Sequence, residues 1–191
     1  MKPRVVITGM GTINPLASSL DEFYTALIQG RSGITRWRTL DLTGIDCQVG
    51  GDLGDFDFKA ALDGLKSRMR EARWNKLRRI FRASSFANKM AALAAVEAFL
   101  DAGWEGVDFD PYRISVVTAG HDFNHNYILS NNLRFIKDPM LVDTLVGMEG
   151  LDTNIAATAS EVLGVFGPTH TVGGACASGN LALRDAYRDI L

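Results

Sequence analysis

One cysteine of this chain stands in a setting that suits nucleophilic chemistry. Cys176 lies within the small-residue run 173–179, which follows a β-branched stretch at 170–172 and precedes a helical pattern over 180–191. A cysteine at a helix N-terminus meets unpaired N–H groups and the positive end of the helix dipole, and both favour the thiolate. The same N–H groups are able to hold a developing oxyanion. The pattern predicts acyl transfer through a thioester on Cys176. A small core cysteine packed among glycines fits the same residues, and spacing alone leaves both interpretations open.

Three histidines are the other side chains suited to acid–base or metal chemistry, and all of them precede Cys176. The i, i+4 spacing of His121 and His125 would suit a metal on a helix, but no third ligand is apparent beyond Asp122, so we predict no metal site. His170 lies six residues before Cys176 on an expected strand. We therefore do not expect its imidazole to turn back onto the thiol.

Alternating strands and helices are expected to position these residues. β-Branched or apolar runs predict strands at 4–9, 113–120 and 170–172, and one more around 47–49. Capping residues and apolar spacing predict helices over 20–29, 85–102, 127–136, 153–163 and 180–191. The first run shows no polar alternation, so we expect a central strand covered on both faces. The order of elements indicates an α/β fold with a largely parallel sheet.

Composition excludes several classes of protein. The 191 residues carry a net charge of −2 and are 47% hydrophobic, which fits one domain, or half of a larger one, with a substantial core. Apolar runs stay far below the ~20 residues needed to cross a bilayer, and the first 20 residues do not resemble a signal peptide. The two cysteines, Cys47 and Cys176, make no disulfide framework, so a cytoplasmic location is expected and Cys47 is interpreted as structural. The charge balance indicates no nucleic-acid partner.

Three motifs resemble the β-ketoacyl synthases of the thiolase superfamily. They are the opening run 5–11 with Pro15 and Leu16, the G-x-S-G-I pattern at 30–34, and Gly167-Pro168 followed by the nucleophile pattern A-C-[AS]-[ST]-[GS] at 175–179. The resemblance extends over the whole chain, and the cysteine motif is its most specific part. The run 121–125 departs from the glycine-rich turn that the family has after this strand.

The resemblance implies a thiolase-like fold built from two similar βαβαβαββ halves, of which residues 1–191 would be the first. It implies that Cys176 is the acyl-accepting nucleophile of a β-ketoacyl synthase in fatty-acid or polyketide synthesis. The second substrate would be a malonyl unit on acyl carrier protein, so the only cofactor expected is the phosphopantetheine carried by that protein. The family's two catalytic histidines and its lysine belong to the second half, which we expect to lie outside this chain.

The resemblance also implies partners and leaves two other functions open. The expected partners are acyl carrier protein and a second ketosynthase subunit, in a homodimer or a heterodimer, with no membrane partner. One alternative is a homologue that only decarboxylates malonyl thioester, and the other is a non-catalytic partner subunit. Both kinds of relative often lack the nucleophile, so the intact run 175–179 argues against them.

A basic stretch over residues 66–82 has two interpretations. It holds eight basic residues and one acid, Glu71, for a net charge of +7. The basic residues are Lys66, Arg68, Arg70, Arg73, Lys76, Arg78, Arg79 and Arg82. They predict either a solvated helical face whose charges pair with acids elsewhere, or a surface that steers an acidic carrier protein.

Overall fold

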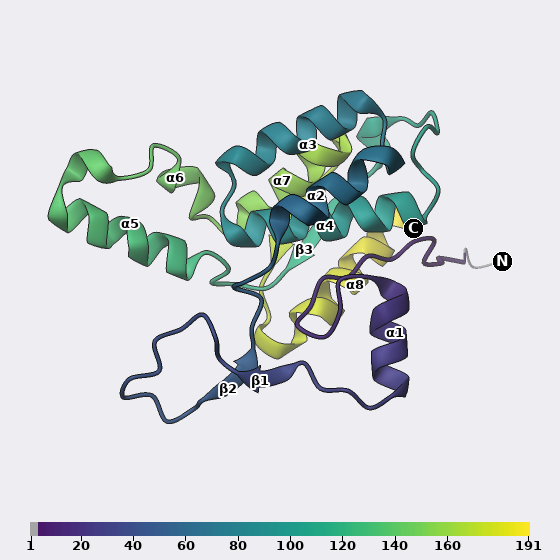
Figure 1. Cartoon of the computed structure of the whole chain (residues 1–191). Helices are drawn as coiled ribbons and strands as arrows, with labels where there is room; N and C mark the ends of the chain where they lie inside the picture. Colours follow the sequence, from purple (N-terminus) through teal and green to yellow (C-terminus); the bar gives the residue numbers. More distant parts are fainter. Residues whose placement is uncertain (1–3) are drawn as a thin grey trace.

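The structure is a computed structural model that describes residues 4–191. Its helices and strands (Figure 1) are α1 (Leu20–Ile28), β1 (Ile34–Arg36), β2 (Val49–Gly51), α2 (Phe58–Leu65), α3 (Glu71–Ala83), α4 (Phe86–Asp101), β3 (Val116–Ala119), α5 (His125–Lys137), α6 (Val146–Glu149), α7 (Thr153–Leu163), β4 (Thr169–Val172) and α8 (Ser178–Ile190). Single 3₁₀ turns lie at Lys66–Arg68, Pro111–Arg113, Pro139–Leu141 and Ala175–Ala177. In the part of the chain described, no helix is both long and apolar enough to span a bilayer.

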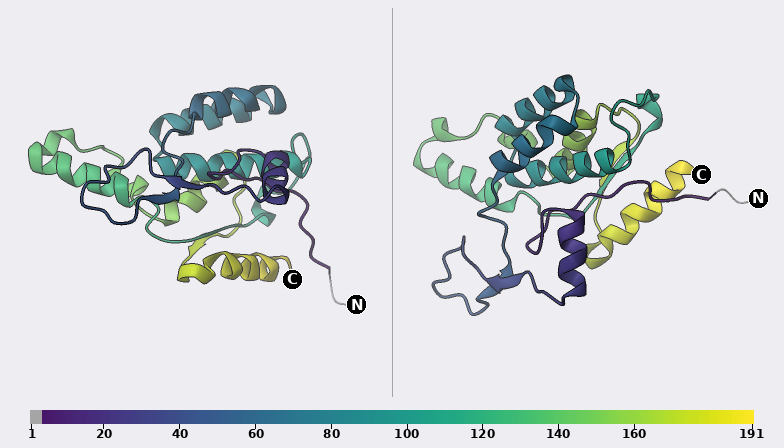
Figure 2. Two further views of the ribbon diagram at one scale, coloured as in Figure 1. Left: turned by 60° about the horizontal axis from the view of Figure 1, so that its bottom comes forward. Right: turned by 45° about the vertical axis from the view of Figure 1, so that its right-hand side comes forward.

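A parallel pair of strands forms the centre of the fold. β3 and β4 pair in register from Val116 opposite Thr169 to Ala119 opposite Val172. Helix α8 contacts the pair as one layer, while α7 contacts both strands and packs against α4. Figure 2 (left) shows the resulting layers, with α8 on one side of the strands and α4 and α3 stacked on the other. β1 and β2 form a separate antiparallel pair.

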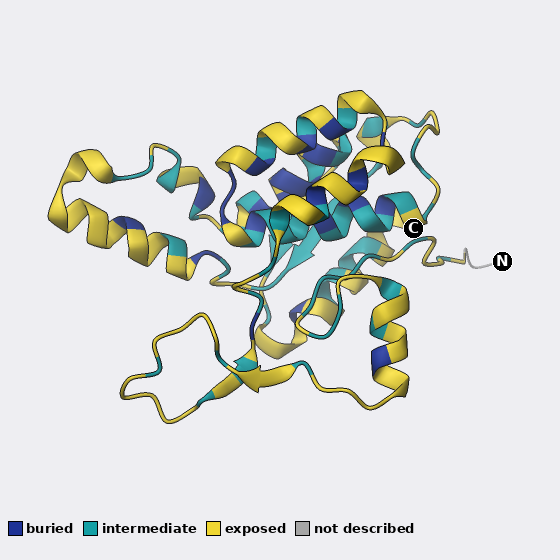
Figure 3. Cartoon of the chain, viewed as in Figure 1, coloured by how far each residue is buried: buried dark blue, intermediate teal, exposed yellow. Residues whose placement is uncertain are grey.

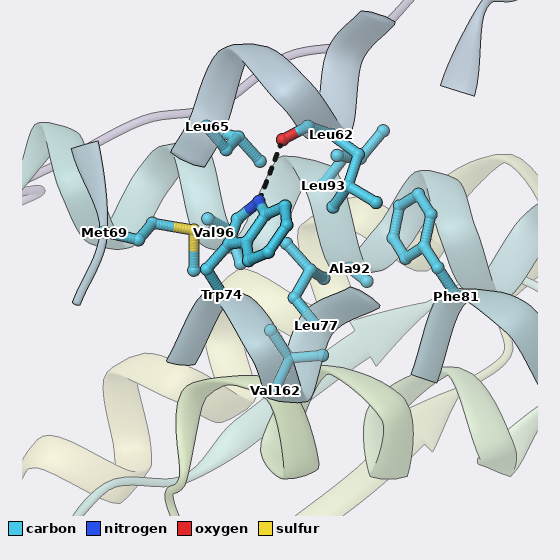
Figure 4. Packing of buried hydrophobic residues seen from close by; sticks show 10 residues of the cluster. All are labelled: Leu62, Leu65, Met69, Trp74, Leu77, Phe81, Ala92, Leu93, Val96 and Val162. Carbon is cyan, nitrogen blue, oxygen red and sulfur yellow. Dashed lines mark hydrogen bonds between the residues drawn. The ribbon is translucent and has the colours of Figure 1, made fainter. Parts of the chain in front are cut away.

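The apolar core lies between the helices more than around the strands. It gathers side chains from α2, α3, α4 and α7, and Figure 4 shows how they pack. Its buried members are Leu62, Leu65, Met69, Trp74, Leu77, Phe81, Ala92, Leu93, Val96 and Val162. The Trp74 indole N–H donates a 3.3 Å hydrogen bond to the Leu62 carbonyl, so its one polar atom is satisfied inside the cluster. This helical core anchors the face of the sheet that α7 covers.

The predicted helices are confirmed, and their capping residues explain where they begin. The Ser19 hydroxyl accepts from the Glu22 N–H at the start of α1, and the Ser85 hydroxyl accepts from the Asn88 N–H at the start of α4. These bonds satisfy N–H groups that have no partner within the helix. The expected strands at 113–120 and 170–172 are also confirmed, as the shorter β3 and the slightly longer β4.

The expected strand over residues 4–9 is wrong for this structure. The segment has no strand pairing, and Val6 and Ile7 are 61% and 75% exposed. It lies across α4 instead, where a Cβ at Gly9 would come within 2.3 Å of the Ala98 carbonyl oxygen. Nearby, the Met10 N–H donates to the Asp101 carboxylate at 2.9 Å. Glycine lets this backbone approach a helix closely, and that contact replaces the ladder that a strand requires.

Two segments extend away from the packed helices: the β1–β2 excursion and the α5–α6 excursion. Most of their residues are exposed (Figure 3). In the β1–β2 excursion, the Asp52 carboxylate accepts hydrogen bonds from the N–H groups of Gly54, Arg38 and Thr39 and from the Thr39 hydroxyl. These bonds, led by those from Gly54 and Arg38, hold the pKa of Asp52 far below its usual value. The α5–α6 excursion exposes large apolar side chains, among them Leu133, Ile136 and Met140.

Candidate active site

Cys176 lies in the turn that joins β4 to α8. Gly173 and Gly174 lead out of the strand, the 3₁₀ turn Ala175–Ala177 carries the cysteine, and α8 begins at Ser178. The buried Ser178 hydroxyl accepts from the Gly174 N–H at 2.9 Å and donates to the Ala175 carbonyl at 2.8 Å. One side chain thus fixes both sides of the cysteine, while the Cys176 thiol is free and exposed.

Close packing beneath the turn explains one of its glycines. A Cβ at Gly174 would lie 2.3 Å from Leu181 Cδ1, a side chain in the first half of α8. Glycine lets the turn lie directly against the Leu181 side chain, which would have to shift to admit a Cβ at this position. The backbone N–H of Cys176 has no acceptor within residues 4–191, and it lies at the N-terminal end of the 13-residue α8. A free N–H at that position is suited to an oxyanion.

The residue before the cysteine is held in a strained conformation. Ala175 has a φ of +47°, in the left-handed region that side chains with a Cβ rarely adopt. A strained non-glycine residue persists only where its surroundings determine the backbone, and the two Ser178 hydrogen bonds do so here. Strain of this kind concentrates at functional sites.

Substitution of Ala175 is expected to reveal the strain. Ala175→Val should lower the free energy of unfolding by about 2 kcal/mol, because a β-branched side chain fits the left-handed region poorly. Thermal denaturation measures the effect, with Ala177→Val as the matched control, since Ala177 is also exposed but has a φ of −91°. Equal losses in the two variants would contradict the assignment of strain to position 175.

The turn after β3 lies at the same edge of the sheet as the cysteine turn. The Gly120 N–H donates to the Val172 carbonyl at 3.0 Å, which continues the pairing one residue beyond β3. The Asp152 carboxylate then accepts from the N–H groups of Asp122 and Phe123 at 2.9 and 3.1 Å. These bonds fix the path of the turn beside the carboxyl ends of both strands.

The structure separates the other candidate residues. The His121 imidazole lies 3.2 Å from the Asp122 carboxylate, and both side chains are exposed. His170 faces α8, where its Nε2 lies 4.0 Å from the Asp185 carboxylate. Cys47 is exposed in the loop before β2. Across residues 4–191 no three metal-ligating side chains gather.

Sequence reasoning missed two residues that shape the site. The Ser178 hydroxyl makes two hydrogen bonds within the cysteine turn, and the Asp152 carboxylate accepts two from the neighbouring turn. A serine at the first position of a helix and an aspartate just before one are ordinary capping signals, so neither residue is distinctive in the sequence.

Three residues of the basic stretch pair with acids of the same chain. Arg68 pairs with Glu97, Arg73 with Glu105 and Lys76 with Glu161, at 2.8, 2.9 and 3.3 Å. The Arg70 guanidinium donates to the Gly106 carbonyl. Ion pairs with acids therefore account for three of the eight basic residues. Lys66 and, on α3, Arg78, Arg79 and Arg82 remain exposed without an ion pair among the described residues.

Comparison with known sequences identifies relatives over nearly the whole chain. Residues 2–191 match the family described as "Beta-ketoacyl synthase, N-terminal domain". The chain is 28% identical to 3-oxoacyl-[acyl-carrier-protein] synthase 2 of Synechocystis sp., over 98% of this chain and 42% of that protein. It is 23% identical to a polyketide biosynthesis malonyl-ACP decarboxylase of Bacillus subtilis, over 99% of this chain and 42% of that protein. The chain thus spans about two fifths of the length of these relatives.

Solved structures show the same fold. A β-ketoacyl synthase from Burkholderia phymatum superimposes with a TM-score of 0.69 at 22% identity, over 97% of this chain and 43% of that one. The ishigamide ketosynthase/chain length factor gives 0.65 at 21% identity, over 88% and 39%. These likenesses confirm the predicted α/β, thiolase-like fold.

Proposed function

This chain belongs to the β-ketoacyl synthase family, as its N-terminal domain, and we propose that it supplies the acyl-accepting cysteine of a ketosynthase. The observation that carries the proposal is the cysteine turn: an exposed Cys176 at the start of α8, after a strained Ala175 and beside a free backbone N–H. Acyl transfer to Cys176, read by mass spectrometry of its tryptic peptide, is the direct test.

The proposed chemistry begins with formation of a thioester. The Cys176 thiolate attacks the carbonyl carbon of an acyl thioester, and the free Cys176 N–H stabilises the oxyanion that forms. The tetrahedral intermediate then expels the thiol of the phosphopantetheine arm on which the acyl carrier protein delivered the acyl group. Condensation with a carrier-bound malonyl unit follows. We propose that residues 1–191 are the first half of the thiolase-like fold and that the histidine pair and lysine belong to the other half.

Decarboxylation without condensation is the second candidate function. It is favoured by the likeness to the Bacillus subtilis protein, whose printed name is a malonyl-ACP decarboxylase. The intact Cys176 turn argues for condensation, because loss of carbon dioxide from a malonyl thioester needs no acyl-cysteine. The non-catalytic partner subunit is less well supported, since such a subunit needs no exposed thiol.

We propose that carrier protein docks at the unpaired arginines of α3. The variant Arg79→Glu/Arg82→Glu should raise the KM for acyl-carrier substrates about tenfold, because charge complementarity acts on encounter with an acidic partner. Turnover of a small acyl-pantetheine thioester should stay unchanged. Steady-state kinetics at low and high salt measure the effect, which salt should reduce.

A conservative variant separates docking from folding in this experiment. Arg79→Gln/Arg82→Gln removes the two charges without reversing them, on side chains of the same length as the two glutamates, and should give a smaller rise in KM. Equal losses on the carrier-bound and the small substrate would mean that these arginines support the fold, and no loss on either would exclude them from docking.

The proposal also includes a dimeric assembly and a cytoplasmic location for the protein. The exposed apolar side chains of the α5–α6 excursion support a ketosynthase homodimer or heterodimer, since such surfaces mark protein interfaces. The free thiols of Cys47 and Cys176 support a reducing compartment such as the cytoplasm.

A further inference from the structure

Ser178 contacts the backbone on both sides of the strained residue in the cysteine turn. Its hydroxyl accepts from the Gly174 N–H at 2.9 Å and donates to the Ala175 carbonyl at 2.8 Å. A hydroxyl has one proton to donate, and here a carbonyl accepts that proton. Ser178 is also buried, so its side chain is neither open to a substrate nor able to give a proton to one. It acts on the site through the backbone of the turn.

Two donors of this one residue hold the Ala175 carbonyl. Besides the hydroxyl, the backbone N–H of Ser178 donates to it. Ser178 is the first residue of α8, so the carbonyl points to the beginning of that helix. Because Ala175 has a φ of +47°, its backbone would leave this conformation if nothing held it. The hydroxyl makes one bond on each side of the strained backbone and keeps it in place.

The carbonyl of Ala175 and the N–H of Cys176 are the two ends of one peptide unit. A trans peptide unit is planar, and its carbonyl and N–H point in opposite directions. With the carbonyl held by Ser178, the Cys176 N–H is directed away from the start of α8. That N–H has no acceptor within residues 4–191, and the thiol of the same residue is exposed. A hydrogen bond to the carbonyl thus sets the direction of a free donor beside the thiol.

We propose that Ser178 is a positioning residue that directs the Cys176 N–H at the oxyanion formed during acylation. The inference rests on the proposed function, because it concerns the same cysteine and the same thioester. As the thiolate adds to the acyl carbonyl carbon, the C=O electron pair moves to oxygen, and the N–H donates to that oxygen. The pair returns when the bond to the pantetheine sulfur breaks. Without the hydroxyl, Ala175 relaxes and the peptide unit turns with it.

Two reactions of the same thiol separate this role from a general structural one. Acylation by acetyl-pantetheine passes through an oxyanion, whereas alkylation by iodoacetamide displaces iodide from a saturated carbon and forms none. Both products are read by mass spectrometry on the tryptic peptide of Cys176 in the complete protein. The ratio of the acylation rate to the alkylation rate reports the N–H donor, because exposure and ionisation of the thiol affect both rates.

Ser178→Ala should lower the acylation rate about a hundredfold, as loss of an oxyanion donor does, and change the alkylation rate by about twofold or less. Ser178→Thr keeps a hydroxyl on the same β carbon and should recover most of the acylation rate. Ser84→Ala is the matched control. Ser84 is buried between α3 and α4, and its hydroxyl donates to the Ile80 carbonyl at 3.0 Å. This variant should keep the wild-type ratio.

A wild-type ratio in Ser178→Ala would overturn the inference. That includes a result in which both rates fall together, since a disordered site would act in that way. If Ser178→Ala shows no cooperative thermal unfolding, Ala175→Gly/Ser178→Ala takes its place, because glycine adopts a positive φ without strain. The ratio in that variant should still be about tenfold below the wild type, since the carbonyl lacks its hydroxyl bond. An unchanged ratio there would equally overturn the inference.

The wild-type protein tests the proposed function separately. A Cys176 that is alkylated but never acylated would refute the proposed function, and the inference with it. A wild type that is acylated, but at the same ratio as Ser178→Ala, would overturn the inference alone and leave the acyl-accepting cysteine in place.

Discussion

Cys176→Ala is expected to lower condensation by about a thousandfold or more, because it removes the atom on which the acyl group is carried. Incubation of the complete wild-type protein with acyl carrier thioester should add one acyl mass to the tryptic peptide 138–184, which contains Cys176. The peptide 39–59, which contains Cys47, should stay unmodified. Mass spectrometry and a condensation assay measure the two effects.

The same measurements provide a control and distinguish the alternative functions. Cys47→Ala should condense like the wild type, since Cys47 lies in an exposed loop before β2, away from the β4–α8 turn. Decarboxylation of malonyl carrier should persist in Cys176→Ala, because that step forms no acyl-cysteine. A protein that decarboxylates but never acylates Cys176 would be the decarboxylase alternative. An acyl group found only on Cys47 would exclude Cys176 as the nucleophile.

The position of the nucleophile was predictable from sequence because it depends on local signals. A β-branched run, two glycines and a helical pattern fix the order strand, turn, helix, and the cysteine motif falls in that turn. Backbone strain at Ala175 and the two hydrogen bonds of Ser178 were not predictable. Both depend on how closely the turn packs on α8, and residue types alone do not encode that distance.

Contacts between residues that are distant in the sequence could not be predicted from it. Apolar residues over 4–9 predict a strand, but a strand exists only where a neighbour offers free N–H and carbonyl groups, and here Gly9 rests on α4 instead. His121 and Cys176 are 55 positions apart, and only the parallel register of β3 and β4 brings their turns to one edge. The same holds for the basic stretch, whose acidic partners Glu97, Glu105 and Glu161 are distant in sequence.

Arg73 forms one of these long-range ion pairs, and its replacement has the largest expected effect on stability. Its guanidinium pairs with Glu105 at 2.9 Å, with side chains only 18% and 15% exposed, and stacks 4.4 Å from the Phe99 ring centre. It also donates to the carbonyls of Val162 and Leu163 at the end of α7. One side chain thus joins α3, α4 and α7 and satisfies carbonyls that have no partner within the helix.

Arg73→Glu is therefore expected to lower the free energy of unfolding by about 3 kcal/mol or more, because it places a second carboxylate against Glu105 and leaves the α7 carbonyls unpaired. Urea denaturation of the complete protein measures the loss.

Arg79→Glu is the matched control. Arg79 lies on the same helix, is exposed and has no ion pair among the residues described. Its replacement should change the free energy of unfolding by about 0.5 kcal/mol or less. Combining Arg73→Glu with Glu105→Arg should recover only part of the loss, because the reversed pair restores the charge contact without the carbonyl bonds. Full recovery would assign the whole effect to the ion pair. Equal stability of Arg73→Glu and Arg79→Glu would mean that neither the ion pair with Glu105 nor the bonds to the α7 carbonyls hold α7 in place.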